Sequence, residues 1–192
     1  EASDIEPILL LNKTDILDDE AQAHLEPMLA RYQTLGYRII RASTKSLSGL
    51  EELHATLDRK VSVFVGQSGV GKSSLVNMLL PGVDIKTLPL SEQTNKGVHT
   101  TTTAKLFHLP NGGQLIDSPG IREFGLWHMD TATLLEGFVE FRPYLGYCKF
   151  SDCSHEHEPA CALLQALEDG HIDPARMHSF QHIKASLDDF TT

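Results

Sequence analysis

The sequence predicts an α/β fold with a mainly parallel sheet, followed by a small helical module. Three observations lead to this prediction. Strand-like and helix-like segments alternate through the first two thirds of the 192 residues, which is typical of a parallel sheet covered by helices. A glycine-rich phosphate-binding pattern lies between a strand and a helix at residues 66–73, and three cysteines fall within residues 148–161. We expect two domains, residues 1–127 and residues 128–192.

Composition and charge narrow the class of protein. Apolar residues make up 41% of the chain and charged residues 22%, an ordinary globular balance. No apolar run approaches the roughly 20 residues of a bilayer span, so we expect no membrane partner. The net charge of −10 lacks the basic surplus that is typical of nucleic-acid binders. The chain opens without Met just before an apolar run, and we interpret it as a fragment of a longer protein.

The first elements follow from hydrophobic spacing. Residues 7–11 and 37–40 are predicted strands. Between them lies a helix that Gly36 ends, with its apolar residues on one face. These residues are Leu25, Met28, Leu29, Tyr32 and Leu35. Pro27 should kink this helix or mark a restart, and Ser48 is expected to cap the next helix.

The middle of the chain predicts three more strands. They are residues 61–65, 103–109 and 113–117. A helix begins near Lys72, and the polar residues 84–99 after it are expected to form a mobile loop. Asn111–Gly112 is the turn signal of a hairpin between the last two strands.

The character of the sequence changes near residue 128. Asp130 is expected to cap one helix, and Gly170 to end another over residues 160–169. Asp173–Pro174 opens the last helix. Because the cysteines lie between the first and second of these helices, we predict a small helical module that the cysteine cluster holds together.

Residues 66–73 match the phosphate-binding loop G-x-x-x-x-G-K-[ST]. The matching residues are Gly66, Gln67, Ser68, Gly69, Val70, Gly71, Lys72 and Ser73. Backbone N–H groups of such a loop surround a phosphate chain at a helix N-terminus. Lys72 would reach the β- and γ-phosphates, Ser73 would bind Mg²⁺, and Ser74 adds to the nucleotide contacts. A chance glycine-rich turn would not explain the strand before it and the helix after it.

Two further segments would complete the phosphate site. Asp117 ends a strand in the pattern D-x-x-G, where it would hold Mg²⁺ through water while the N–H of Gly120 senses a γ-phosphate. This pattern alone is a common turn, and the phosphate loop gives it meaning. Thr101, in the run Thr100–Thr102, would bind Mg²⁺ and order the loop in the triphosphate state; the alternative is a β-prone start of the next strand.

A guanine-reading pattern precedes the phosphate loop. It comprises Asn12, Lys13, Thr14 and Asp15, and the segment Ser43, Thr44 and Lys45 would complete the base pocket through backbone N–H groups. The Asp15 carboxylate can accept two hydrogen bonds from guanine, and adenine offers no equivalent donors. Asn12 would contact the base edge and tie down the phosphate loop. Because the guanine pattern comes first, the order of the motifs is that of a circularly permuted Ras-like P-loop GTPase.

Four residues form a predicted zinc site. They are Cys148, Cys153, His155 and Cys161. Three thiolates and one imidazole give a tetrahedral set with no open position, so we expect the zinc to be structural. His157 is the competing ligand, and the alternatives for the cysteines are a disulfide with one free thiol, or three buried thiols.

Together these motifs resemble the circularly permuted GTPases of the RsgA/YjeQ family, which depend on the small ribosomal subunit. The resemblance covers Asn12 to His182, and its most specific part is D-S-P-G-x-R-E-F-G-L-W-H from Asp117 to His128. It implies a cytoplasmic GTPase that binds the small subunit, both rRNA and proteins, late in maturation and hydrolyses GTP to GDP there. The family carries an oligonucleotide-binding barrel ahead of the GTPase domain. That barrel, and the strand and helix that normally precede the strand ending at Asn12, are not in this sequence, so we expect the chain to be poorly stable alone.

The sequence leaves the water-orienting group open. Ile121 occupies the place after Gly120 where a glutamine is expected, and isoleucine cannot orient water, so intrinsic turnover should be slow. Our hypothesis for the missing group is His99, which precedes the threonine run; the alternative is that His99 packs against a partner or faces solvent.

Other functions remain possible at this point. A P-loop ATPase or small-molecule kinase would not need Asp15 to read guanine. A nucleotide-regulated binding module would bind a partner without stimulated turnover. Nothing in the sequence suggests an obligate dimer, so we expect a monomer.

Overall fold

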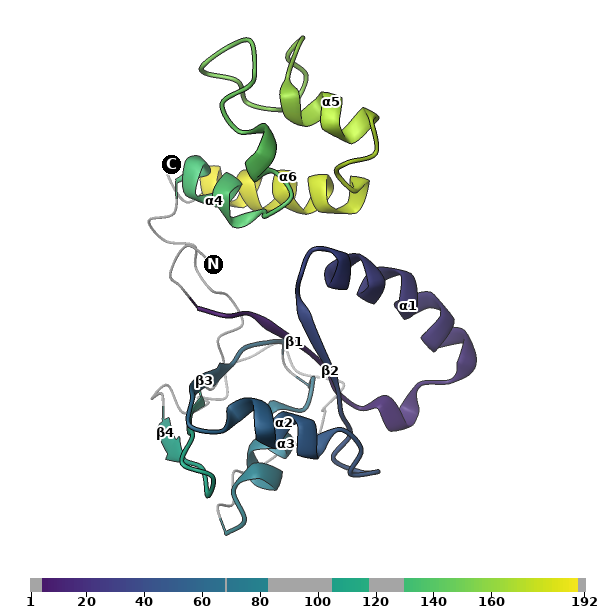
Figure 1. Cartoon of the computed structure of the whole chain (residues 1–192), viewed down its shortest axis with the longest axis vertical. Coiled ribbons are helices and arrows are strands. Elements are labelled where there is room, and N and C mark those ends of the chain that lie inside the picture. The colour runs from purple at the N-terminus through teal and green to yellow at the C-terminus, as the bar shows by residue number, and fades with distance from the viewer. Residues whose placement is uncertain (1–4, 68, 83–104, 118–129, 190–192) are drawn as a thin grey trace. The chain divides into compact units, whose positions relative to one another are not determined.

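The computed structural model describes residues 5–67, 69–82, 105–117 and 130–189. The chain divides into two compact units (Figure 1). The first unit spans residues 8–124, and the second comprises residues 125–192 and the first seven residues. The predicted switch loop, with His99 and Thr101, lies outside the described residues, as do Ser68 and Gly120.

The first unit opens with a parallel strand pair. Strand β1 (Ile8–Leu11) pairs with β2 (Arg38–Arg41), and helix α1 (Asp19–Thr34) connects them. The Asp18 side chain accepts from the Ala21 N–H at 2.8 Å and caps α1. The helix continues through Pro27, so the predicted restart is wrong. Pro27 lies on the solvent side, where water can satisfy the carbonyl that proline leaves without a donor.

A second set of strands carries the phosphate-binding loop. Strand β3 (Val61–Phe64) leads to the loop and then to helix α3 (Lys72–Leu79). Strand β5 (Gln114–Asp117) lies between β3 and β4 (Lys105–His108), parallel to β3 and antiparallel to β4. Two of the three described strand pairs are therefore parallel, as predicted. The described strands form two separate hydrogen-bonded sheets rather than the single sheet that the alternation suggested.

Helix α2 (Leu50–Leu57) begins after Gly49, and the predicted Ser48 cap is wrong. Gly49 has φ +68°, and a Cβ there would lie 1.8 Å from the Arg41 carbonyl oxygen. This close approach to β2 requires glycine at the cap position. The Ser48 hydroxyl instead lies 2.9 Å from the hydroxyl of Ser46.

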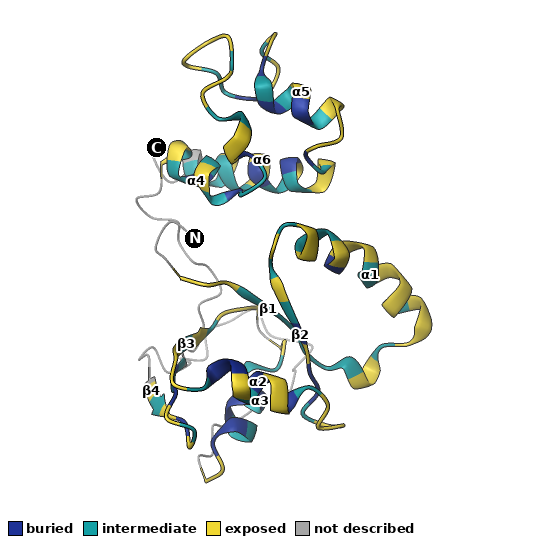
Figure 2. Cartoon of the chain, viewed as in Figure 1, coloured by how far each residue is buried: buried dark blue, intermediate teal, exposed yellow. Residues whose placement is uncertain are grey.

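One apolar core fills the first unit between its helices and strands (Figure 2). Its fully buried residues are Ile40, Ala42, Val76, Leu79 and Leu115. They come from β2 and the residue after it, from α3 and from β5, so this core packs the phosphate-loop helix against both sheets. Helix α1 contributes only Leu29 as a buried residue, and Figure 2 shows most of α1 exposed.

The second unit is helical around an aromatic core. It comprises α4 (Thr131–Gly137), α5 (Ala162–Glu168) and α6 (Pro174–Asp189), with a short 3₁₀ turn at Arg142–Tyr144. Asp130 caps α4 through the Thr133 N–H, and Gly170 follows α5 with φ +76°, both as predicted. Phe138, Phe141 and Phe180 pack with ring centroids 4.8–5.7 Å apart. None of the helices in the described residues is long and apolar enough to cross a membrane.

Candidate functional site

The backbone of the phosphate-binding loop needs its glycines. Gly66, Gly69 and Gly71 have φ of +153°, +83° and +97°, which other residues rarely adopt. Gly71 is the N-cap of α3, so the loop runs directly into the N-terminus of that helix. Helix N-termini attract anions because their N–H groups are unpaired and the helix dipole is positive there.

The Lys72 side chain folds back over this loop. Its ammonium donates to the carbonyl oxygens of Gly66 at 2.5 Å and Gln67 at 2.9 Å. The positive charge is therefore already held at the loop that the motif predicts to bind phosphate. Ser73 and Ser74 follow in the first turn of α3, and both are half-buried.

The guanine-reading segment is bonded directly to the phosphate-binding loop. Asn12 Nδ2 donates to the Val70 carbonyl at 2.8 Å, and Lys13 Nζ donates to the Gly69 carbonyl at 2.7 Å. A Cβ at Gly71 would lie 2.3 Å from Asn12 Nδ2, so glycine is required for this contact. Asn12 Oδ1 is buried and has no partner among the described residues, and a bound molecule with a hydrogen-bond donor would satisfy it.

Asp15 is held by the segment that follows β2. The buried Ser43 hydroxyl donates to Asp15 Oδ1 at 2.5 Å, and Lys45 Nζ lies 3.8 Å from Asp15 Oδ2. The hydrogen bond from Ser43 is the main reason why the pKa of Asp15 lies below its ordinary value. The carboxylate is therefore ionised and accepts only, as recognition of the guanine N–H groups requires.

The other residues predicted for the base pocket also form hydrogen bonds within the protein. Thr14 donates from its N–H and its hydroxyl to the Ala42 carbonyl at 3.3 and 3.2 Å. The Ser43 N–H donates to the Ser48 carbonyl, and the Lys45 N–H donates to the Ser43 hydroxyl. Thr44 donates its N–H to no residue in the described ranges, so we expect it to be the backbone group of this segment that reaches the base.

Strand pairing places the predicted magnesium segment beside the loop. In the parallel ladder, Asp117 at the end of β5 is opposite Phe64 at the end of β3. Phe64 is two residues before Gly66, and carboxyl ends of parallel strands meet at one sheet edge. The backbone of Asp117 thus lies next to the start of the phosphate-binding loop.

The second unit holds a cluster of four possible metal ligands. The donor atoms of Cys148, Cys153, His155 and Cys161 all lie within 4.8 Å of one another. Cys148 Sγ is 3.9 Å from Cys161 Sγ and 3.6 Å from His155 Nδ1. His155 Nδ1 is 3.3 Å from Cys161 Sγ. We call these four residues the metal cluster.

These separations fit a tetrahedral metal. Ligands bound to zinc at their usual lengths are roughly 3.3–3.8 Å apart. His155 is buried, whereas its predicted rival His157 is exposed and lies outside the metal cluster. Burial raises the pKa of Cys153 to about 12, so a cation is needed to stabilise its thiolate at neutral pH.

Three residues around the metal cluster were not predicted from the sequence. Glu158 accepts hydrogen bonds from Ser154, whose hydroxyl is the main reason why the pKa of Glu158 lies far below its ordinary value. Lys184 of α6 donates to the Ser154 carbonyl at 3.1 Å. A glutamate near cysteines and a lysine 30 residues away form no motif, so the sequence carries no signal for them.

A model of the RsgA GTPase family matches residues 1–127. The chain belongs to the RsgA GTPase family. The small ribosomal subunit biogenesis GTPase RsgA of Azotobacter vinelandii is 60% identical over 187 residues, which cover 97% of this chain and 54% of that protein. The RsgA of Pseudomonas aeruginosa is 58% identical, with 97% and 55% covered. This member of the family therefore spans about half the length of the curated relatives it matches.

Two solved structures of similar fold agree with this family assignment. The crystal structure of YjeQ from Thermotoga maritima has a TM-score of 0.78 and 32% identity, over 97% of this chain and 61% of that one. The structure of YloQ, described as a circularly permuted GTPase, has a TM-score of 0.75 and 29% identity, with 97% and 58% covered. The predicted permuted α/β GTPase fold of this family member is confirmed.

Proposed function

We propose that this chain binds GTP and hydrolyses it to GDP and phosphate. The observation that carries the proposal is the pair of hydrogen bonds from Asn12 and Lys13 to the phosphate-binding loop. They join a guanine-reading segment to a triphosphate-binding loop in one site. Asp15 supplies the base specificity, and Lys72 supplies positive charge to the phosphates.

The residues at the phosphate end fit a magnesium ion. Ser73 would bind it directly, with Thr101 in the triphosphate state, and Asp117 would hold it through water, while Gly120 donates its N–H to the γ-phosphate. The register of β3 and β5 supports this set, because it puts Asp117 beside the loop. When bound, Mg²⁺ neutralises the charge that develops on the phosphates. The Lys72 ammonium would neutralise the same charge. To do so, it would exchange its hydrogen bonds to the carbonyls of Gly66 and Gln67 for contacts with the phosphates.

We assign the orientation of the attacking water to His99, because Ile121 cannot do so. The test is His99→Ala, measured for GTP affinity and for turnover. Unchanged GTP affinity with turnover lowered by about 10²-fold is expected for loss of a group that orients the water. Unchanged turnover at full stimulation would remove His99 from the mechanism.

In the second unit, Cys148, Cys153, His155 and Cys161 would hold one structural zinc. The donor set supports zinc, since two or more thiolates with an imidazole suit this ion and four protein ligands leave no open position. Its contribution would be to folding, because the ligands come from segments that the metal joins.

We propose that the partner of this protein is the small ribosomal subunit, with its rRNA and proteins. We further propose that the protein acts in the cytoplasm as a monomer. The names of the relatives support this partner. The test is GTP turnover with and without small subunits, for this chain and for a chain that also carries an N-terminal barrel. Stimulation of both chains places activation in the two units described above. Stimulation of neither would contradict the proposal and leave a slow GTP-binding switch.

A further inference from the structure

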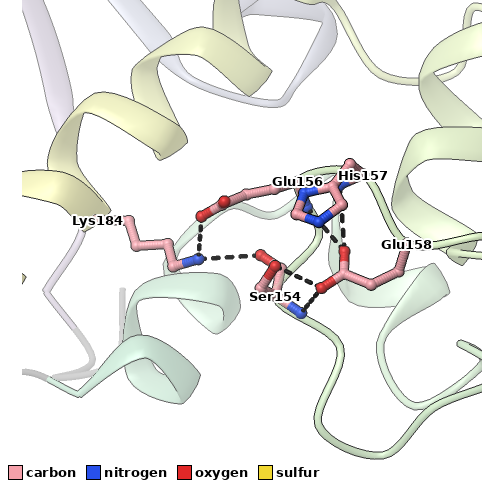
Figure 3. Close-up of polar contacts among 5 residues, drawn as sticks. All are labelled: Ser154, Glu156, His157, Glu158 and Lys184. Carbon is pink, nitrogen blue, oxygen red and sulfur yellow. Dashed lines mark hydrogen bonds and ion pairs between the residues drawn. The ribbon is translucent and has the colours of Figure 1, made fainter.

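A single carboxylate organises the turn that presents the metal-binding histidine. Glu158 Oε1 accepts from the Ser154 hydroxyl and from the Ser154 N–H, the latter at 2.7 Å. Glu158 Oε2 accepts from the N–H groups of Glu156 at 3.1 Å and His157 at 3.2 Å. Figure 3 shows the carboxylate facing these donors across the turn. We call residues 154–158 the ligand turn.

The hydrogen bonds of the ligand turn separate His155 from His157. His155 has φ +61°, in the left-handed region that is unfavourable for residues other than glycine. The residue is 8% exposed, and its Nδ1 faces the sulfurs of Cys148 and Cys161. The N–H of His157 is turned to Glu158, and the His157 side chain is exposed. The backbone geometry of the turn therefore decides which histidine reaches the cysteines.

The other side of the ligand turn is fixed to α6. Lys184 Nζ donates to the Ser154 carbonyl at 3.1 Å and to Glu156 Oε1 at 2.7 Å (Figure 3). The Lys184 side chain is 15% exposed, while that of Glu156 is 51% exposed. The bond to the Ser154 carbonyl is the more sheltered of the two, and it connects the turn to a helix that packs on the core of the same unit.

We propose that Glu158 and Lys184 are positioning residues of the metal centre, which select His155 over His157 as its fourth ligand. Glu158 accepts hydrogen bonds from N–H groups on both sides of His155 and so holds His155 in its left-handed conformation. Lys184 anchors the turn to α6. Glu158 is not one of the four residues whose donor atoms gather in the metal cluster, and its oxygens instead accept hydrogen bonds within the turn. This inference rests on the proposed zinc site.

The test compares zinc affinity and histidine ligation in the full chain. Glu158→Gln keeps the shape of the side chain but replaces one acceptor by an NH₂ group that faces the turn's N–H donors. We expect zinc affinity, from competition with a chromogenic chelator, to fall by about 10–100-fold. Glu168→Gln, an equal change of charge on an exposed residue at the end of α5, should leave it unchanged. Lys184→Met keeps the aliphatic stem and should also weaken zinc, with partial recovery in Lys184→Arg.

Ligation is read separately from affinity. Imidazole ¹⁵N spectra of the zinc form, and the visible spectrum of the Co²⁺ form, report which histidine binds and whether the site is tetrahedral. In the unaltered chain His155 Nδ1 should bind, and in Glu158→Gln a share of His157 ligation or a water-bound Co²⁺ spectrum should appear. If Glu158→Gln and Lys184→Met keep the original affinity and the His155 signal, the positioning role is wrong while the zinc site stands. If the unaltered chain binds no zinc, the proposed metal centre itself fails.

Discussion

At the scale of single residues, Asp15 gains its role from the groups that surround it. Ser43 donates to one carboxylate oxygen and accepts the N–H groups of Lys45 and Ser46, each at 3.1 Å. One hydroxyl thus fixes both the carboxylate and the loop that would lie beside the base. The proposed guanine preference would follow from this arrangement, and not from the acid alone.

Asp15→Asn should change the base preference from guanosine to xanthosine nucleotides. An amide offers a donor where the carboxylate only accepts, and xanthine presents an acceptor at the position of the guanine amino group. We expect GTP affinity to fall by about 10²-fold or more, as when a buried polar pair is mismatched, while XTP affinity rises. Fluorescent nucleotide titration measures both. An equal loss for all nucleotides would show that Asp15 does not read the base.

Ser43→Ala should raise the pKa of Asp15 toward its ordinary 3.8, because it removes the strongest hydrogen bond to the carboxylate. In the unaltered protein the folded pKa is lower than the unfolded one. The ionised carboxylate therefore adds stability that is complete above about pH 3.8 and is lost as the pH falls through the folded value. The pH titration of the Asp15 ¹³Cγ resonance checks the shift. An unchanged midpoint in Ser43→Ala would contradict it.

The residue identities of the motifs were predictable, whereas their supporting contacts were not. Gly66 to Ser73 and Asn12 to Asp15 have fixed spacings, so a pattern finds them. The bonds from Glu158 and Lys184 to the ligand turn depend on tertiary packing. No local spacing predicts such bonds. The close approach of Gly71 to Asn12 is also set by packing, although the glycine itself belongs to the motif.

At the scale of elements, helix α3 connects phosphate binding to the core. Its first residues form the end of the phosphate-binding loop, and Val76 and Leu79 on its inner face are fully buried. Alternating strands and helices were predictable from apolar spacing. The division into two sheets was not, because hydrogen bonding between distant strands leaves no mark on the local pattern.

Gly71→Ala should disrupt the junction between the loop and α3. The new Cβ would meet Asn12 Nδ2 at 2.3 Å, in addition to the strain of φ +97°. We expect GDP affinity to fall by about 10-fold or more, since backbone strain alone costs about 1–3 kcal/mol. Gly82→Ala is the matched control, because Gly82 has φ +99° and nothing within 4 Å of the added Cβ. If both variants lost GDP affinity equally, the collision with Asn12 would be unimportant.

Phe180→Ala should weaken the second unit. Phe180 of α6 is fully buried and contacts the rings of Phe138 and Phe141. Truncation of such a side chain costs about 3–5 kcal/mol, measured from hydrogen exchange of the His171 and Ile172 amides, which donate to the Ala166 carbonyl. Tyr147→Ala, which alters a residue that is 78% exposed, should change the free energy of exchange by about 0.5 kcal/mol or less. Equal effects of the two variants would contradict this core.

At the scale of the whole molecule, the chain has two units with separate cores. The core of the first contains α3 and β5, and the core of the second contains Cys161 of the metal cluster. We propose that these units are the two predicted domains. A sequence pattern was sufficient to predict two domains, because the phosphate motifs and the cysteines are far apart in the chain.

The free energy of unfolding of each unit should depend on a different ligand. GDP with Mg²⁺ at about 100 times its dissociation constant should add about 2.7 kcal/mol to the first unit alone. A strong zinc chelator should destabilise the second unit alone, since metal binding is part of its folding free energy. Hydrogen exchange of the Leu79 and Ile172 amides reports the two units separately. Equal shifts of both amides with either ligand would mean that the chain unfolds as one unit.

The bond between Asn12 and Val70 has a consequence for the synthesis of the chain. Val70 follows Asn12 by 58 residues, about 3–12 s at roughly 5–20 residues per second. Strand β3 pairs only with β5 among the described strands, and the first residue of β5, Gln114, is made later still. A nascent chain thus contains both the guanine-reading segment and the phosphate-binding loop before the ladder behind that loop can form.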